Sequence, residues 1–290
     1  MSIRHSTRLN PPKFTLSQLK IYAYLVPIAI FMLLPILYIF NHAFKPIDEL
    51  FAFPPRFFVQ RPTVENFRRL LQTTQQSGVP LGRYIFNSLM ITIVVVIASV
   101  LIATMAGFAL SKLKFKGRNA LFELNTIALM FVPAAVQIPR YLIIDGINIL
   151  DTYWAHILPL IAMPVGLFLV KQFIDQIPDS LIEAAVVDGA SMYAIYRKVV
   201  LPLIKPAIAT IAILSFQQVW NNIETSSLFT SDEGMRTLAF FMNSLSNDAN
   251  VVAGQGIGAA SGLIMFIPNL ILFIILQSNV MNTMAYSGLK

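Results

Sequence analysis

The densest group of polar side chains that could do chemistry lies in an otherwise apolar stretch of the C-terminal half. Gln217, Asn221 and Glu224 are spaced at i, i+4 and i+7, so on one continuous helix they share a face. Their amides and carboxylate could hydrogen-bond the hydroxyls of a sugar, and Trp220 could cover its apolar face. Burying unpaired polar groups at membrane depth is costly unless they face a wet cavity or a neighbouring helix. These residues therefore indicate either the wall of a polar translocation path, with or without direct solute contact, or hydrogen bonds between helices.

Single polar residues in other apolar stretches are weaker candidates for the same role. They are Asn87, Gln137 and Asn269. No catalytic constellation accompanies them, because the sequence contains no cysteine and its three histidines lack metal-ligand spacing. We expect His156, near Trp154, to lie at a membrane interface and not to bind a metal. A phosphate-binding G-x-x-x-x-G-K-[ST] loop is absent, so the chain is expected to be no enzyme and any ATP hydrolysis must come from another subunit.

Four glycines open the last long apolar stretch. They are Gly254, Gly256, Gly258 and Gly262. A dinucleotide-binding turn would need a preceding strand in a soluble domain. The series therefore predicts close helix packing or a smooth surface facing a pore.

A polar island between two long apolar segments, residues 178–206, predicts two short helices joined at a glycine. Pro178 interrupts the preceding helix, Ser180 can cap the next one, and Glu183 completes a capping box. The residues expected to share one narrow face of this first helix are Leu181, Ala184 and Ala185.

The second half of the island carries turn and breaker residues. Gly189 can adopt a left-handed conformation, and Ser191 can cap a second short helix. Pro202 and Pro206 then punctuate the exit into the following apolar run. We expect a compact helix-turn-helix elbow on one side of a membrane.

Composition indicates a membrane protein with several spans. Hydrophobic residues make up 56% of the chain, charged residues only 12%, and the mean hydropathy is +0.69. An ordinary soluble domain is less apolar and more charged. The absence of cysteine excludes disulfides and thiolate chemistry. The net charge of +7 is explained by membrane topology, and a nucleic-acid partner is not expected.

Six stretches are predicted to span the membrane, since about 20 apolar residues cross its hydrocarbon core. They are Ile21–Ala43, Tyr84–Leu110, Leu121–Tyr141, Tyr153–Val170, Ala207–Phe229 and Ala253–Leu276. Of the 21 Lys and Arg residues, 13 lie at the ends that carry both termini and the elbow, so these ends are expected to face the cytoplasm. The expected segments are a cytoplasmic N-terminal segment (1–20), the first span (21–43), an external loop capping the pore (44–83), a five-helix core containing the elbow (84–281) and a cytoplasmic tail (282–290).

The elbow resembles the EAA loop of permeases of ATP-driven (ABC) importers. That pattern is E-A-A, a glycine four residues on and, after nine residues, I-x-L-P; the chain follows it with Glu183-Ala184-Ala185, Gly189 and Val199-Val200-Leu201-Pro202. In that family the elbow is a coupling helix seated in a cytoplasmic ATPase subunit. The resemblance implies this coupling role for Glu183, Ala184, Ala185, Asp188, Gly189, Leu201 and Pro202. The alternative is an ordinary connecting loop in which Glu183 only caps a helix.

Further motifs resemble permeases of carbohydrate importers of the maltose and multiple-sugar class. They are PTVENFRRLL, FNS, KFKGR, VPAAVQIPRY, ILDTYWAHILP and the Trp220-Asn221 pair. Where such permeases usually continue with aromatic and proline residues, this chain has NIETSSLF. The resemblance implies an all-α, six-span, MetI-like ABC permease fold in a prokaryotic inner membrane.

The resemblance also implies partners and a mechanism. The partners are a second homologous permease, two copies of a cytoplasmic ABC ATPase that bind ATP and magnesium, and an extracytoplasmic solute-binding protein. The chain itself is expected to bind no cofactor and to import oligosaccharides by alternating access. Two alternatives remain: a similar importer for a polyamine or an amino acid, and a secondary transporter, although no internal repeat is visible.

Overall fold

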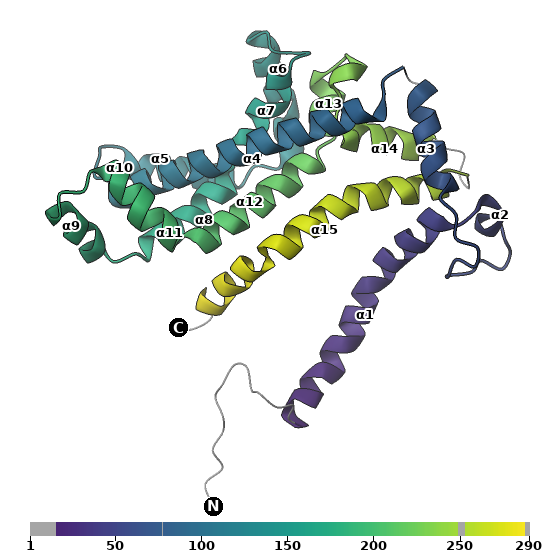
Figure 1. Cartoon of the computed structure of the whole chain (residues 1–290). Coiled ribbons are helices and arrows are strands. Elements are labelled where there is room, and N and C mark those ends of the chain that lie inside the picture. Colours follow the sequence, from purple (N-terminus) through teal and green to yellow (C-terminus); the bar gives the residue numbers. More distant parts are fainter. Residues whose placement is uncertain (1–15, 77, 249–252, 288–290) are drawn as a thin grey trace, which may run out of the picture.

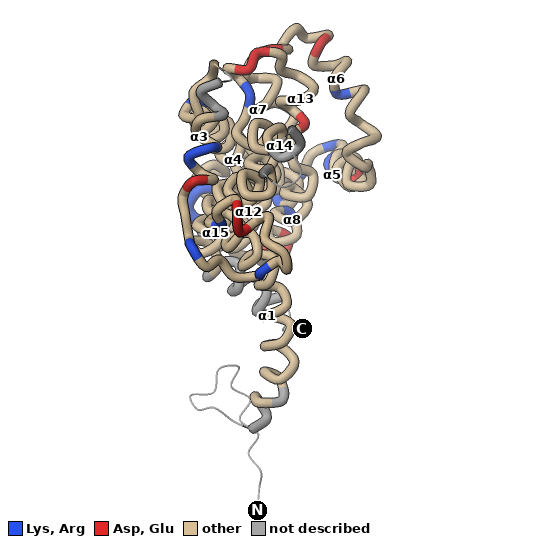
Figure 2. The backbone as a smooth tube through the Cα atoms, turned by 90° about the vertical axis from the view of Figure 1, so that its right-hand side faces the viewer, with Lys and Arg blue, Asp and Glu red and all other residues tan. Residues whose placement is uncertain are grey.

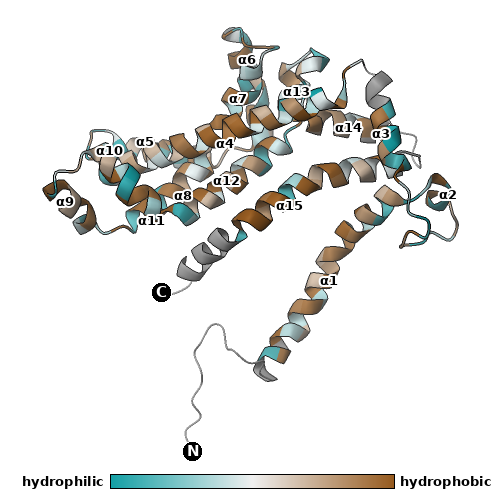
Figure 3. Ribbon diagram, in the orientation of Figure 1, coloured by the Kyte–Doolittle hydropathy of each residue, from teal (hydrophilic) through white to brown (hydrophobic). Residues whose placement is uncertain are grey.

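The chain is built from long apolar helices joined by short ones (Figure 1). The computed structural model describes residues 16–76, 78–248 and 253–287, and within these ranges every regular element is helical. The long helices are α1 (Leu16–Phe44), α4 (Leu81–Lys112), α12 (Lys205–Trp220) and α15 (Ala253–Ser287). Figure 3 shows hydrophobic residues along most of α1, α4 and α15. Figure 2 shows that charged positions are sparse along the backbone.

Shorter elements complete the chain. Before and after α4 lie α2 (Ile47–Leu50), α3 (Glu65–Gln76), α5 (Arg118–Ala128), the 3-10 turn η1 (Pro133–Val136), α6 (Gln137–Gly146), α7 (Tyr153–Ile161) and α8 (Pro164–Asp175). The elbow contains α9 (Asp179–Val187), α10 (Met192–Ile195), the π-helical turn η2 (Tyr196–Val200) and α11 (Leu201–Leu203). Between α12 and α15 lie α13 (Glu224–Phe229), the 3-10 turn η3 (Glu233–Met235) and α14 (Leu238–Asp248).

Four segments among the described residues are long and apolar enough to cross a membrane. They are Ile21–Phe44, Leu81–Lys112, Tyr153–Asp175 and Gly254–Gln277, and they agree with four of the predicted spans. Two bent helix pairs would raise the number to six if each pair were one span. The chain is thus an all-helical, multi-pass membrane protein.

The third and fifth predicted spans do not form single straight helices. The third is divided into α5 and the η1–α6 segment, which meet at 109°. Val132 is extended there because a residue before proline, here Pro133, is disfavoured in the helical region. The fifth was expected to continue to Phe229, but α12 ends at Trp220. Its polar face is therefore interrupted.

Helix α4 is the centre of the bundle and packs against α8 and α12. Gly107 makes the contact with α8 close, since a Cβ there would lie 2.7 Å from Val170 Cγ1. One buried cluster joins this contact to the elbow through Ile174, Ile195 and Val200. The elbow and three membrane helices therefore share one core.

Helix α1 packs mainly on α15 and diverges from the rest of the bundle in Figure 1. Asn66 of α3 joins these two helices, because its amide donates to the Ala43 and Lys45 carbonyls at 3.0 and 2.8 Å. A Cβ on Gly256 would lie only 2.6 Å from Asn66 Oδ1. The close packing predicted as one reading of the glycine series is therefore found at Gly256, whereas an added Cβ at Gly262 would have ordinary room.

Candidate functional site

The first helix of the elbow begins earlier than expected. Pro178 is the N-cap of α9, and Ser180 lies inside the first turn, without a side-chain cap hydrogen bond at this end. The predicted capping box of Ser180 and Glu183 is therefore wrong. Pro178 fits the N-cap because it has no amide hydrogen to leave unpaired, and Asp179 places negative charge in the first turn.

The turn after α9 is a Schellman motif, as a left-handed glycine allows. Gly189 has φ +78°, its N–H donates to the Val186 carbonyl, and the Ala190 N–H donates to the Ala185 carbonyl, both at 2.9 Å. Ser191 then caps α10, its Oγ accepting from the Ala194 N–H at 3.2 Å. The predicted roles of Gly189 and Ser191 in the local structure are confirmed.

The two alanines of the elbow face different ways. Ala185 is half-buried and packs, with Ile182, on the core shared with α4 and α8. Ala184 and Glu183 are exposed. The expectation that Leu181, Ala184 and Ala185 form one face is therefore wrong for Ala185, because Ile182 and Ala185 are the pair that faces the core.

Exposed apolar side chains form the tip of the elbow, which we define as Leu181, Val186, Val187, Met192 and Tyr193. Val187 is 86% exposed and Tyr193 is 67% exposed. Three exposed carboxylates flank the tip: Asp179, Glu183 and Asp188. An apolar patch with a charged rim is typical of an interaction surface.

Lys112, at the end of α4, holds the start of the elbow. Its Nζ lies 2.6 Å from both the Ile177 carbonyl and the Asp179 carboxylate, and its side chain is only 7% exposed. This hydrogen bond, with the positive charge behind it, lowers the pKa of the Asp179 carboxyl. Sequence reasoning used Lys112 only for orientation; no local signal joins residues so far apart.

The C-terminal part of the elbow also packs on α4. The Tyr196 hydroxyl lies 2.8 Å from Thr104 Oγ1, and the Tyr196 ring lies against Phe108. Leu201 packs on the same core, and Pro202 lies in α11, where the chain bends by 80° into α12. The elbow is therefore fixed to α4 at both ends.

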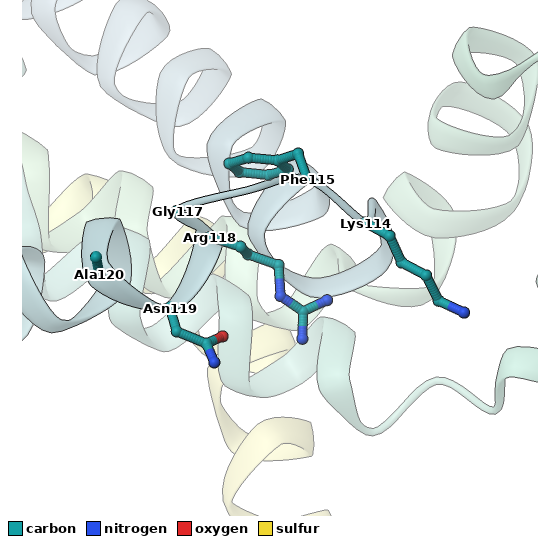
Figure 4. Close-up of a pocket in the computed structure, with 6 residues that line it drawn as sticks. All are labelled: Lys114, Phe115, Gly117, Arg118, Asn119 and Ala120. Carbon is teal, nitrogen blue, oxygen red and sulfur yellow. The ribbon is translucent and has the colours of Figure 1, made fainter.

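A basic turn follows α4 on the same side of the molecule. It lines a cavity of about 380 Å³ with Lys114, Phe115, Gly117, Arg118, Asn119 and Ala120 (Figure 4). Gly117 has φ +88°, a conformation that turns the chain into α5. The Arg118 guanidinium donates to the Ser111 and Leu113 carbonyls at 3.4 Å. Lys114 contributes to the lowered pKa of Asp179, so this turn adds positive charge beside the elbow.

The predicted polar face on the fifth span is not formed. Asn221 ends α12, and Asn222 Oδ1 accepts from the Thr225 N–H at 2.9 Å, which starts α13. A side chain that bonds the backbone in this way competes with helix continuation. Gln217 and Asn221 are exposed, whereas Glu224 pairs with Arg140 of α6 at 2.8 Å.

Two of the other candidates are buried structural residues. Trp220 is 3% exposed and its Nε1–H donates to the Met265 carbonyl at 3.1 Å. Asn87 is fully buried, donates to the Gly234 and Arg236 carbonyls at 2.9 Å and accepts from the Tyr153 hydroxyl at 2.8 Å. Neither side chain is available to a solute in the isolated chain.

Gln137 and Asn269 are both half-buried. Gln137 begins α6, while the Asn269 amide donates to the Met265 carbonyl at 3.0 Å.

His156 is fully buried within the protein. Its Nδ1 and Nε2 lie 2.8 and 3.0 Å from the Thr225 and Thr230 hydroxyls. Among the described residues, no group of three His, Asp or Glu side chains could hold a metal ion.

Comparisons with known proteins give the family. Residues 99–280 match the binding-protein-dependent transport system inner membrane component family. The arabinooligosaccharides transport system permease protein AraQ of Halalkalibacterium halodurans is 30% identical over 93% of this chain and 94% of its own length. The inner membrane ABC transporter permease protein YcjP of Escherichia coli is 26% identical over 96% and 98%.

A solved structure shares the fold. It belongs to a bacterial ABC transporter involved in the import of the acidic polysaccharide alginate. The TM-score is 0.78 at 22% identity, covering 92% of this chain and 99% of that one. The chain therefore belongs to the binding-protein-dependent transport system inner membrane components, and its resemblance to carbohydrate ABC importer permeases is confirmed.

Proposed function

We propose that this chain is one of two permease subunits of an ATP-driven importer of oligosaccharides. The other parts are a homologous permease, two copies of an ABC ATPase that hold ATP and magnesium, and an external solute-binding protein. Relatives named for arabinooligosaccharides support an oligosaccharide as the solute.

The observation that carries this proposal is the elbow. Its apolar tip is exposed, while its other face belongs to the core that contains α4, α8 and α12. An ATPase bound to the tip would move α4, α8 and α12 together with the elbow. The carboxylates of Glu183 and Asp188 favour a partner surface with basic groups around an apolar cleft.

The proposed topology has six spans, with each bent pair counted as one. In Figure 1 α1 begins and α15 ends toward the side on which the elbow lies, which supports a topology with these helix ends and the elbow on one side of the membrane. The excess of Lys and Arg at these ends of the predicted spans supports a cytoplasmic location for this side. ATP-driven closure of the ATPase pair would then open the path outward, and hydrolysis would reset it.

Site-directed crosslinking tests the proposal, since the sequence contains no cysteine. Ala184→Cys in the co-expressed complex should crosslink to the ATPase, and ATP hydrolysis should rise when an oligosaccharide-loaded binding protein is added. Ala135→Cys, an exposed alanine beyond α5, is the matched control and should not reach the ATPase. Crosslinking of Ala184→Cys only to lipid reagents during turnover would refute the coupling role.

A further inference from the structure

A cavity of about 260 Å³ lies where the end of α12 meets α14 and α15. The exposed amide residues Asn221 and Asn243 line it, together with Ser261 of α15. Ligand pockets for drug-sized molecules measure about 300–1,000 Å³. This cavity is therefore the size of one unit of a longer molecule.

Two glycines line the α15 wall of the cavity. Gly258 and Gly262 lie on either side of Ser261 in the sequence. At Gly262 an added Cβ would meet only Ile39 Cγ2 of α1, at the ordinary distance of 3.7 Å, so packing does not require glycine there, in contrast to Gly256.

The Ser261 hydroxyl is a buried polar group that lacks a protein partner. The residue is 2% exposed, and its Oγ makes no hydrogen bond to any described residue. Buried hydroxyls are nearly always paired, because an unpaired one has lost its water without compensation. A hydroxyl group entering the cavity would supply the missing partner.

The lining is uncharged. Its polar side chains are Asn221, whose amide also donates to the Gln217 carbonyl at 3.0 Å, Asn243 and Ser261, and Met242 and Met265 add adaptable apolar contacts. Glu224, the carboxylate nearest in sequence, is paired with Arg140 at 2.8 Å and does not line the cavity. An ammonium or carboxylate group placed here would lie without a counter-charge, which disfavours it.

We propose that this cavity, with Asn221, Asn243 and Ser261 in its lining, binds one neutral glycosyl unit of the transported oligosaccharide. The inference rests on the proposed function and narrows its substrate class. Amides donate to and accept from sugar hydroxyls, and the methionine side chains cover the apolar face of the ring. Polyamines and uronate-containing chains carry charges for which the lining offers no counter-charge, so their binding in this cavity is disfavoured.

Protection of a single cysteine tests this assignment in the whole complex. Asn243→Cys is labelled with a small thiol reagent during ATP turnover, with arabinopentaose, xylopentaose or cellopentaose, tetragalacturonate or spermidine present. At least one neutral pentaose should slow the labelling several-fold, and the charged probes should not. Ser227→Cys, an exposed α13 residue outside the lining, should label equally under all conditions.

The Ser261→Ala variant supplies a second readout. Loss of one neutral hydrogen bond should raise the half-protecting pentaose concentration about five- to tenfold, with no loss of thermal stability of the complex. Three outcomes would each overturn the assignment. The neutral pentaoses could all leave the labelling unchanged, the charged probes could protect the cysteine, or the partner permease could already cover it.

ATP hydrolysis separates this inference from the proposed function. If a pentaose-loaded binding protein stimulates hydrolysis while Asn243→Cys stays unprotected, the cavity assignment fails and the importer stands. If no oligosaccharide-loaded binding protein stimulates hydrolysis, the proposed function fails, and the cavity assignment fails with it.

Discussion

Individual polar residues in this protein mainly connect helices to one another or to turns through hydrogen bonds. Lys112 ties α4 to the start of the elbow, Asn66 ties α1 to α3, and Asn87 ties α4 to the turn before α14. Each of these groups satisfies backbone carbonyls that a helix end or a turn leaves open. In a membrane protein such pairing is strongly favoured, because no water is available in the hydrocarbon region to replace it.

Gly256 is a residue at which a single methyl group should destabilise the protein. Gly256→Ala would push a Cβ to within 2.6 Å of Asn66 Oδ1, and overpacking of this kind costs about 1–3 kcal/mol. The effect on thermal stability should shrink strongly in an Asn66→Ala background, as a double-mutant cycle measures. Gly82→Ala, where an added Cβ meets nothing within 4 Å, is the control and should not destabilise the protein.

Lys112→Met removes the ammonium group but keeps an unbranched side chain. The Ile177 carbonyl and the Asp179 carboxylate then lose their shared donor, so hydrogen exchange in α9 should become faster. The exposed Lys116→Met is the matched control and should leave exchange unchanged.

The Lys112–Asp179 pair should also depend on pH. Lys112 lowers the folded-state pKa of Asp179, so the pair stabilises the fold above the ordinary carboxyl pKa of about 4. This contribution is lost as the pH falls through the lowered folded-state value. The stability difference between the wild type and Lys112→Met should therefore be constant above about pH 5 and shrink in stronger acid to the part that comes from the hydrogen bond to the Ile177 carbonyl. A difference that grows in acid would contradict the assignment.

At the scale of elements, the elbow is held together by its own backbone hydrogen bonds and is held in place by contacts with α4. Its turn is closed by the Schellman hydrogen bonds at Gly189 and its second helix by the Ser191 cap. Its position depends on Tyr196 and Lys112, which contact α4. The elbow should therefore tolerate substitutions of the exposed tip residues, but substitutions that alter the backbone conformation of its turn should destabilise it.

Substitutions at Gly189 test the turn itself. The left-handed conformation at φ +78° disfavours residues with a Cβ by about 1–2 kcal/mol, and asparagine tolerates it better than valine. Gly189→Pro would in addition lose the N–H that bonds Val186. Protease resistance of the elbow should fall in the order Gly, Asn, Val, Pro. Gly146→Val, at a glycine with open space and no positive φ, should not change it.

At the scale of the whole molecule, much apolar surface is left uncovered. None of the most apolar window of the first span is buried, and only 17% of that of the last span is. Lipid or a second permease must cover these helices in the membrane. One buried cluster nevertheless links the elbow to the centre of the bundle.

Reversing one charge at the elbow should uncouple the assembled transporter. Glu183→Lys places a cation in the acidic rim of the tip, so it should abolish substrate-stimulated transport while the protein still reaches the membrane. Asp145→Lys, the same kind of change at an exposed residue of α6, is the control and should transport normally. Uptake assays and membrane quantification distinguish the two variants; normal uptake by Glu183→Lys would count against coupling through this surface.

Local properties were readable from the sequence. Composition identified a multi-pass membrane protein, and the turn at Gly189 and the cap at Ser191 followed from their own and adjacent residues. These features depend on nearest neighbours, so one sequence is sufficient to determine them. The capping box at Ser180 failed by a shift of two residues at the helix start.

Only the tertiary structure decided which polar residues are free to meet a solute. Lys112 and Asp179 are 67 positions apart, and Arg140 and Glu224 are 84 apart, yet both pairs are in contact. The end of α12 at Trp220 likewise separated Asn221 from Glu224, and folding brought Asn221 to Ser261 of α15 instead. Periodicity describes one continuous helix; it contains no information on where a competing side-chain bond ends that helix or which distant helix packs beside it.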